Sequence, residues 1–229
     1  MRNTQRVLYI PLAEAVADTS IGADISSITA ESYSNPGVLL SQEFAKNNQV
    51  YLSLSSEGQL EAFFMVGWSE INLHGAPIDC VFLGLSAVTA KRKGSGIVLT
   101  LYGRFFHDAA QIANSRNRPV AWWFHTASPI VAGVMWKIAD DIGPQPDGTL
   151  SAEQHVLLRA IQDRYNFLPY RDERMPCVLR RFAQARYARD EVSRLNARRA
   201  RDRSILDDWN IDEAAGDRVL FVGQSLPSR

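Results

Sequence analysis

The feature that most constrains the fold is an apolar strand joined to a long helix by a basic, glycine-containing loop. Residues 78–88 form an apolar run of the kind that is buried on both faces of a sheet. Residues 94–115 then favour a helix with one apolar face. That face repeats at helical spacing through Ile97, Leu101, Phe105, Ala109 and Ile112. A strand followed by a helix that packs on the sheet predicts a mixed α/β fold.

The loop between them reads Lys91-Arg92-Lys93-Gly94-Ser95-Gly96. Backbone N–H groups at a helix N-terminus lack partners inside the helix, and the helix dipole is positive there. Glycines let a phosphate approach the backbone, and the three cations add charge. The chain lacks the GxxxxGK[ST] string of a P-loop, and Leu99 stands where a dinucleotide-binding fingerprint needs its third glycine. The loop therefore predicts a phosphate or pyrophosphate site of another kind.

The remaining sequence predicts further strands and helices around this unit. Proline, glycine and asparagine mark the breaks between them. Expected strands are residues 6–11, 50–55, 59–71, 120–125 and 218–225. Expected helices are residues 24–34 with Asp24 as cap, 38–46, 128–141 with Ser128 as cap, and 151–165. Residues 176–181 favour a short strand and residues 182–209 favour helix. We expect one domain over residues 1–229, with a helical, arginine-rich elaboration at about 145–215.

Composition and charge exclude several classes of function. The chain has 229 residues, 46% hydrophobic content and a formal net charge of zero, so no global field steers it toward nucleic acid or membrane. Two cysteines and four scattered histidines offer no disulfide framework and no metal-ligand spacing. The N-terminus has no long apolar run, and we expect a cytoplasmic protein without a membrane segment or a bound metal.

With this loop between an apolar strand and a long helix, the chain resembles the GNAT superfamily of N-acyltransferases. That family carries [RQ]xxGx[GA] at this place, and here lysine stands first, at Lys91. The resemblance implies a mostly antiparallel sheet flanked by helices, with a helical insertion before the last strand. It also implies that acetyl-CoA or another acyl-CoA is the donor. The pyrophosphate would bind the loop, and the pantetheine arm would lie along the end of strand 78–88. The residues so implied are Leu85, Ser86, Ala87, Val88, Lys91, Arg92, Lys93, Gly94, Ser95, Gly96 and Ile97.

The resemblance implies a reaction too. An amine of a small molecule or peptide would attack the thioester directly, and a bulge in the fourth strand would offer a backbone N–H to the oxyanion. Many members use a tyrosine in the helix that follows the fifth strand and a glutamate in or near the fourth. Residues 128–141 contain no tyrosine, and residues 78–88 contain only Asp79. We therefore name His125 and Ser128, at the mouth of the expected gap between strands, as candidate catalytic residues.

Other interpretations stay open at this stage. The enzyme could work by positioning alone, or the domain could bind a thioester without turning it over. Trp122 and Trp123 alternate faces, so one is expected to border the gap while the other packs in the core. Cys80 and Cys177 have no histidine near them in sequence, and buried cysteines are usually inert.

Residues 176–204 carry nine arginines and three acidic residues, a net charge of +6. A solvated face with intrachain ion pairs is the favoured interpretation. An alternative is a docking surface for an acidic partner such as an acyl carrier protein, which would then supply the acyl group. Nucleic acid has no supporting motif here. Because the insertion would lie beside the acceptor, we hypothesise that it shapes acceptor specificity.

Overall fold

The computed structural model describes residues 6–199 and 205–228. Its centre is one mixed sheet in the order β1-β2-β3-β4-β5-β8-β6, with β7 also paired to β8. The strands are β1 (Arg6–Pro11), β2 (Gln49–Leu54), β3 (Leu60–Leu73), β4 (Ala76–Val88), β5 (Val120–Thr126), β6 (Ile142–Gly143), β7 (Val178–Leu179) and β8 (Arg218–Ser225). Only the β4–β5 pair is parallel among these strands. The expected mostly antiparallel sheet is confirmed.

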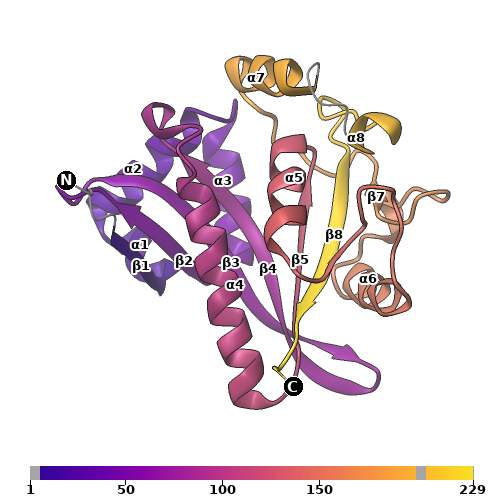
Figure 1. Cartoon of the computed structure of the whole chain (residues 1–229). Helices are drawn as coiled ribbons and strands as arrows, with labels where there is room; N and C mark the ends of the chain where they lie inside the picture. The colour runs from indigo at the N-terminus through magenta and orange to yellow at the C-terminus, as the bar shows by residue number, and fades with distance from the viewer. Residues whose placement is uncertain (1–5, 200–204, 229) are drawn as a thin grey trace.

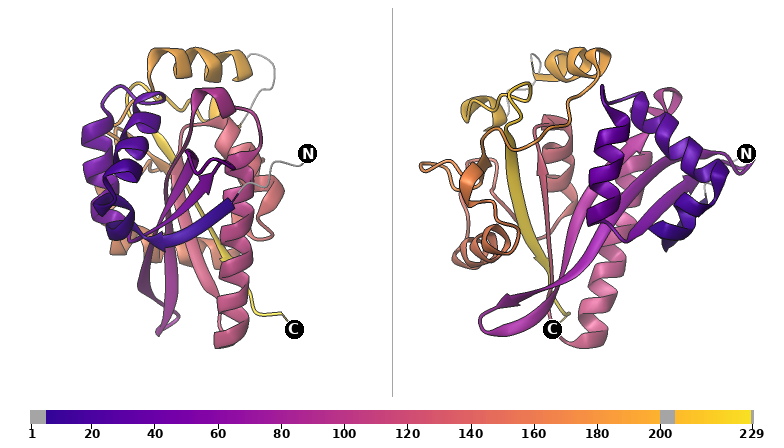
Figure 2. Two further views of the ribbon diagram at one scale, coloured as in Figure 1. Left: turned by 90° about the vertical axis from the view of Figure 1, so that its left-hand side faces the viewer. Right: turned by 180° about the vertical axis from the view of Figure 1, so that it is seen from behind.

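Helices cover both faces of the sheet (Figures 1 and 2). The α-helices are α1 (Leu12–Ala17), α2 (Thr19–Ala30), α3 (Pro36–Lys46), α4 (Ile97–Arg116), α5 (Pro129–Ile138), α6 (Ala152–Arg164), α7 (Arg189–Arg199) and α8 (Ile205–Asp208). One face carries α4 and α5, and the other carries α1 to α3 and α6. Helix α7 lies across the end of the molecule where α4 and α5 begin. The helical insertion expected before the last strand is present.

The long helix α4 packs as its pattern predicts. Leu101, Phe105 and Ala109 have no solvent exposure. Burying a leucine or phenylalanine side chain stabilises a fold by about 1.5–3 kcal/mol. The helix ends at Asn117, whose φ of 48° places it in the left-handed conformation common after a helix. This packing fixes the first residues of α4 close to the end of β4.

Strands β4 and β5 separate part-way along the sheet. Their parallel pairing runs from Asp79 opposite Val120 to Phe82 opposite Trp123, and then stops. Beyond that point β4 continues to Val88 while pairing only with β3. The edge of β4 after Phe82 therefore faces a gap instead of a neighbouring strand.

Several helix boundaries differ from the predictions. The first long helix ends at Ala30, not at residue 34, because residues 32–34 bond to residues 186–188 instead. The first long helix begins at Thr19, because the carboxylate of Asp18 accepts the backbone N–H groups of Ser20 and Ile21. The predicted start at Asp24 was therefore wrong. Helix α5 ends at Ile138, not at 141, because Ile142–Gly143 pairs with β8.

The prediction of helix over residues 182–209 was wrong for its first part. Residues 182–188 are extended because they bond to distant backbone: Ser34 N–H donates to Arg186, and Ala188 N–H donates to Ser32. Tertiary hydrogen bonds of this kind override local helix propensity. The strand expected at 176–181 shrinks to Val178–Leu179. No described helix combines the length and the apolar character that a bilayer crossing requires.

Candidate functional site

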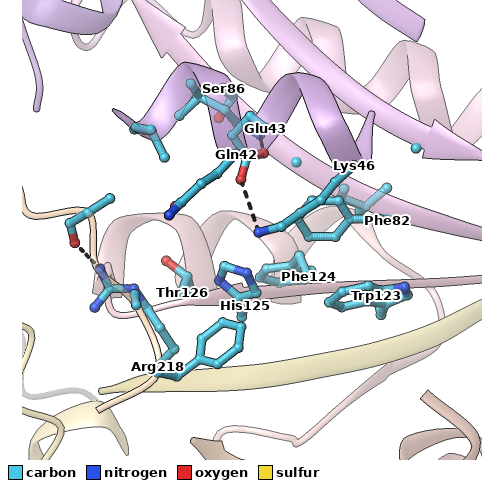
Figure 3. Close-up of a pocket in the computed structure, with 18 of the residues that line it drawn as sticks. Gln42, Glu43, Lys46, Phe82, Ser86, Trp123, Phe124, His125, Thr126 and Arg218 are labelled. Atoms are coloured by element: carbon cyan, nitrogen blue, oxygen red, sulfur yellow. Dashed lines mark hydrogen bonds and ion pairs between the residues drawn. The ribbon is translucent and has the colours of Figure 1, made fainter. Parts of the chain in front are cut away.

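A cavity of about 740 Å³ opens where β4 and β5 separate. Its walls come from α3, β4, β5, residues 182–187 and the start of β8 (Figure 3). The volume is within the range of small-molecule sites, and such sites favour a cleft with a few convergent polar groups. Because the strand separation itself makes the opening, the cavity passes through the sheet from the α3 face toward α4 and α5.

Helix α3 packs unusually close to β4. Gly84 has no side chain, and a Cβ placed there would overlap the amide of Asn47. The register of β3 and β4 shifts between Phe64 and Val66, where β4 carries one extra residue. This is the bulge that the sequence interpretation expected in the fourth strand. Glycine at 84 lets the end of α3 lie directly on it.

The close packing brings a carboxylate to the bulge. Glu43 is buried on α3 and accepts the Leu85 backbone N–H at 2.9 Å and the Asn47 side-chain amide at 3.0 Å. Burial raises the pKa of the Glu43 carboxyl, while Lys46 opposes that shift. The bulge N–H expected to face an oxyanion is therefore occupied by Glu43 in the free protein.

Glu43 was not predicted from the sequence, because the glutamate was expected in or near the fourth strand. A signal was present: Leu39, Leu40 and Glu43 share the buried side of α3. An acidic residue on the apolar face of a helix requires a specific partner, because an unpaired buried charge is costly. In this chain the partners come from β4 and from Asn47, which no local pattern reveals.

His125 lies on the cavity wall, as predicted for the mouth of the gap. The side chain is half-buried, and its Nδ1 atom is buried without a hydrogen-bond partner among the described residues. Burial, Lys46 and Arg218 lower the pKa of His125 to about 3. The imidazole is therefore neutral at physiological pH and a weak proton acceptor.

Ser128, the other predicted catalytic residue, caps α5. Its hydroxyl accepts the Val131 N–H at 3.3 Å, and its own N–H donates to Thr126. The side chain is buried and outside the cavity lining. The structure gives it a part in starting α5; a catalytic part stays a prediction.

The basic loop lies between β4 and α4, at the same end of the sheet as the strand separation. Gly96 precedes α4 with a φ of 84° and supplies no capping side chain, so the first N–H groups of the helix have no such partner. Gly94 also has a positive φ, of 83°. Gly94, Ser95 and Gly96 are exposed. This is the backbone geometry of an anion site.

The basic side chains of this loop point to different places. Lys93 donates to Glu191 of α7 at 3.0 Å. Arg92 pairs with Glu61 of β3 at 3.4 Å, and Lys91 is exposed. The structure therefore joins α7, from the arginine-rich insertion, to the predicted phosphate loop.

No protein-family model matches the chain, and no curated protein matches it. Among solved structures, the ribosomal-protein-S18-alanine N-acetyltransferase from Escherichia coli matches with a TM-score of 0.52 over 99% of this chain and 97% of its own, at 7% identity. The chain has the GNAT fold. The sequence-based resemblance is thus confirmed at the level of the fold.

Other GNAT-related structures match over less of the chain. A probable N-acyltransferase from Enterococcus faecalis V583 has 17% identity and a TM-score of 0.43, covering 58% of this chain and 32% of its own. A GNAT family N-acetyltransferase from E. coli, in complex with CoA, has 16% identity and a TM-score of 0.37, covering 58% of this chain and 69% of its own. This chain thus spans about a third of the Enterococcus protein.

The aromatic residues of the GNAT core divide as predicted. Trp123 lines the cavity, whereas Trp122 is buried on the other face of the sheet, 5.3 Å from the ring of Phe106. Four tyrosines line the cavity, and two of them hydrogen-bond to residues of β4 and β5. Tyr102 of α4 shares a 2.6 Å hydrogen bond with Ser86 of β4, and Tyr187 of the insertion bonds Thr126. Burial raises the pKa of each phenol, so both stay protonated.

The two cysteines are unsuited to nucleophilic attack. Burial raises the pKa of the Cys80 and Cys177 thiols to about 12, which disfavours a thiolate nucleophile. No cluster of metal-ligating side chains occurs within the described ranges. Arg180 pairs with Asp172 and Asp217, as the solvated-face interpretation expects. Residues 1–5, Arg201 and Arg203 lie outside the described residues.

Proposed function

We propose that this protein is an N-acyltransferase that moves an acyl group from acetyl-CoA or a longer acyl-CoA to an amine. The observation that carries the proposal is the end of β4–β5 pairing at Phe82 and Trp123, with the glycine loop at the same end of the sheet. A strand edge without a neighbour can pair with a pantetheine arm, and the loop N–H groups suit a pyrophosphate. The GNAT fold of the E. coli S18-alanine enzyme supports this reading.

The donor would occupy the loop and the strand edge. Its pyrophosphate would take the backbone N–H groups of Gly94, Gly96 and Ile97, with Lys91 adding charge. The N–H groups of Arg92, Lys93 and Ser95, which were also expected to bind it, already donate to carbonyls within the loop. Its arm would run along Leu85 to Val88, whose other side already pairs with β3. The thioester would then reach the cavity from the α4–α5 side of the sheet.

Glu43 is our proposed proton acceptor, in place of the glutamate missing from the fourth strand. The amine attacks the thioester carbonyl carbon, the carbon–sulfur bond breaks, and the amine proton passes to Glu43. A raised pKa brings its carboxyl nearer to the operating pH than His125, whose pKa is about 3. Protonated Glu43 holds the Leu85 N–H less strongly, which leaves that N–H for the developing oxyanion. Tyr102 or Tyr187 would return a proton to the thiolate.

Titration calorimetry with acetyl-CoA, octanoyl-CoA and CoA tests the donor. We expect micromolar binding of at least one thioester to the purified chain. Mass spectrometry of the protein as purified is an independent measurement, because a retained CoA species would identify the acyl chain. A folded sample that gives no heat with any thioester would overturn the proposal.

A carrier-protein donor is the second candidate, and one observation favours it. Helix α7, from the basic insertion, contacts the phosphate loop through Glu191 and Lys93. An acidic acyl carrier would meet exposed Arg189 there while its arm entered the strand gap. This version predicts turnover with an acylated carrier, weak binding of free thioesters, and loss of turnover in Arg189→Glu.

A further inference from the structure

Two cations face the cavity from opposite walls, with a histidine between them (Figure 3). Lys46 comes from the last turn of α3, and Arg218 is the first residue of β8. Both lower the pKa of His125, and no carboxylate is among the causes that oppose them. Lys46 pairs with Glu43 at 3.8 Å, and Glu43 also lines the cavity.

The two cations are held differently. Arg218 is nearly buried. It donates to the carbonyls of Asp217 and Ala185 at 2.7 and 3.0 Å and pairs with the Glu213 carboxylate at 3.5 Å, so its position is fixed. The ammonium of Lys46 lies 3.8 Å from Glu43, near the limit of an ion pair, and its side chain is 45% exposed. Lys46 can therefore turn to an added anion at small cost.

Aromatic rings form the rest of this chamber. The ring centroids of Phe82 and Trp123 are 4.5 Å apart, and those of Phe182 and His125 are 4.9 Å apart. Phe167 packs at 5.5 Å from Trp123. These rings border the same cavity as Lys46, and flat side chains such as these favour a flat apolar ligand.

We propose that the acceptor is an amine that also carries an aromatic ring and a carboxylate. The carboxylate would lie between Lys46 and Arg218. The ring would pack against Trp123 and Phe182. The amine would lie toward Glu43. An aromatic α-amino acid offers all three groups.

The proposal rests on the proposed function, because it assigns the acceptor to the same site. The anion it invokes is distinct from the donor phosphates. Those would bind at the loop, and the pantetheine arm that enters the cavity carries no charge. The donor thus offers no anion to Lys46 and Arg218.

The test uses two product-like probes, N-acetyl-L-phenylalanine and its neutral carboxamide, titrated into CoA-loaded protein by calorimetry. One probe keeps the charge and the other keeps only the shape. The ratio of their dissociation constants therefore measures the contribution of the carboxylate charge to binding. We expect the acid to bind about tenfold more tightly or better, as for a charge-assisted hydrogen bond. Lys46→Gln should remove most of that preference and leave the carboxamide unaffected. Lys137→Gln, the same change on the exposed side of α5, is the matched control.

Equal affinities for acid and carboxamide would overturn the proposal, as would binding of neither probe. So would indistinguishable behaviour of Lys46→Gln and Lys137→Gln. Titrating CoA thioesters alone separates this failure from that of the proposed function. If thioesters bind while the probes show no charge preference, only the acceptor assignment fails. If the acid binds through Lys46 while no thioester binds, the acyltransferase proposal fails and the anion site stands.

Discussion

The phosphate loop and the cavity lie at the same end of the sheet, yet the chain builds them in opposite ways. The loop is one short run, residues 91–96, whose Gly94, Ser95 and Gly96 are exposed to solvent. The cavity collects side chains from α3, β4, β5, residues 182–187 and β8. The loop depends on backbone conformation, whereas the cavity depends on which distant side chains meet.

The two regions should therefore respond to different kinds of substitution. A change of backbone freedom in the loop should weaken donor binding and leave the acceptor chamber intact. A change of charge in the cavity should alter chemistry and acceptor choice while donor affinity stays the same. Single substitutions in each region test whether donor binding and acceptor chemistry are separate.

Replacing Gly96 with valine should have the largest effect. A β-branched residue is strained at a φ of 84°, and its side chain would occupy the space in front of the α4 N-terminus. We expect acyl-CoA affinity to fall by about a hundredfold or more, measured by calorimetry. Gly58→Val is the matched control, because Gly58 has a φ of 81° and equally open surroundings in the β2–β3 turn. Equal losses in both variants would show that strain alone is responsible.

Glu43→Gln should come next. Glutamine keeps the shape and can still accept the Leu85 N–H, but it cannot take the amine proton. We expect kcat to fall by about a hundredfold, as for loss of a general base, with acyl-CoA affinity unchanged. Thiol release reports kcat, and calorimetry reports binding. An unchanged kcat would refute the role of Glu43, and loss of donor binding would break the separation between the two regions.

The loop could be predicted because its signal is local. A strand, two glycines and a long apolar helix stand in sequence order from Ile78 to Ala113, and each feature depends on near neighbours. The mostly antiparallel sheet was implied by the resemblance that this segment carries. Helix ends were less certain because caps compete: Asp18 and Asp24 are both plausible caps, and only the packing of α1 and α2 decides between them.

The cavity could be predicted only in part. His125 follows from its place at the end of β5, but Glu43 and Arg218 enter through α3 and β8, far away in sequence. Whether Glu43 meets Leu85 depends on Gly84 and on a bulge whose register sequence does not specify. The extended course of residues 182–188 likewise depends on bonds to residues 32–34. Such pairings are set by tertiary packing, so local propensity cannot reveal them.

His125→Asn should change how stability depends on pH. The folded pKa of His125 is about 3, below the value of about 6.5 in an unfolded chain. The unfolded chain therefore binds a proton between these values and the folded chain does not, so His125 destabilises the fold as pH falls below 6.5. As pH falls from 6.5, we expect the unfolding equilibrium constant of wild type to rise by up to about tenfold more per pH unit than that of the variant.

Urea unfolding at pH 7, 6 and 5 measures this slope. Lys46, Glu43 and Arg218 remain in both proteins, so their own titration cancels to first order in the comparison. His107→Asn on the exposed side of α4 is the control. Equal slopes for wild type and His125→Asn would show that water reaches the ring, and would contradict a shielded cavity.

Glu191→Gln should have the smallest effect, and it challenges the separation directly. Glu191 belongs to the distant insertion, yet it holds Lys93 of the loop at 3.0 Å. Removing its charge frees the ammonium for a phosphate, so we expect acyl-CoA affinity to rise about two- to fivefold at low salt. Asp190→Asn, its exposed neighbour on α7, makes the same change in net charge. An equal rise in both variants would indicate a general field, whereas a fall in Glu191→Gln alone would mean that this pair holds Lys93 in its binding position.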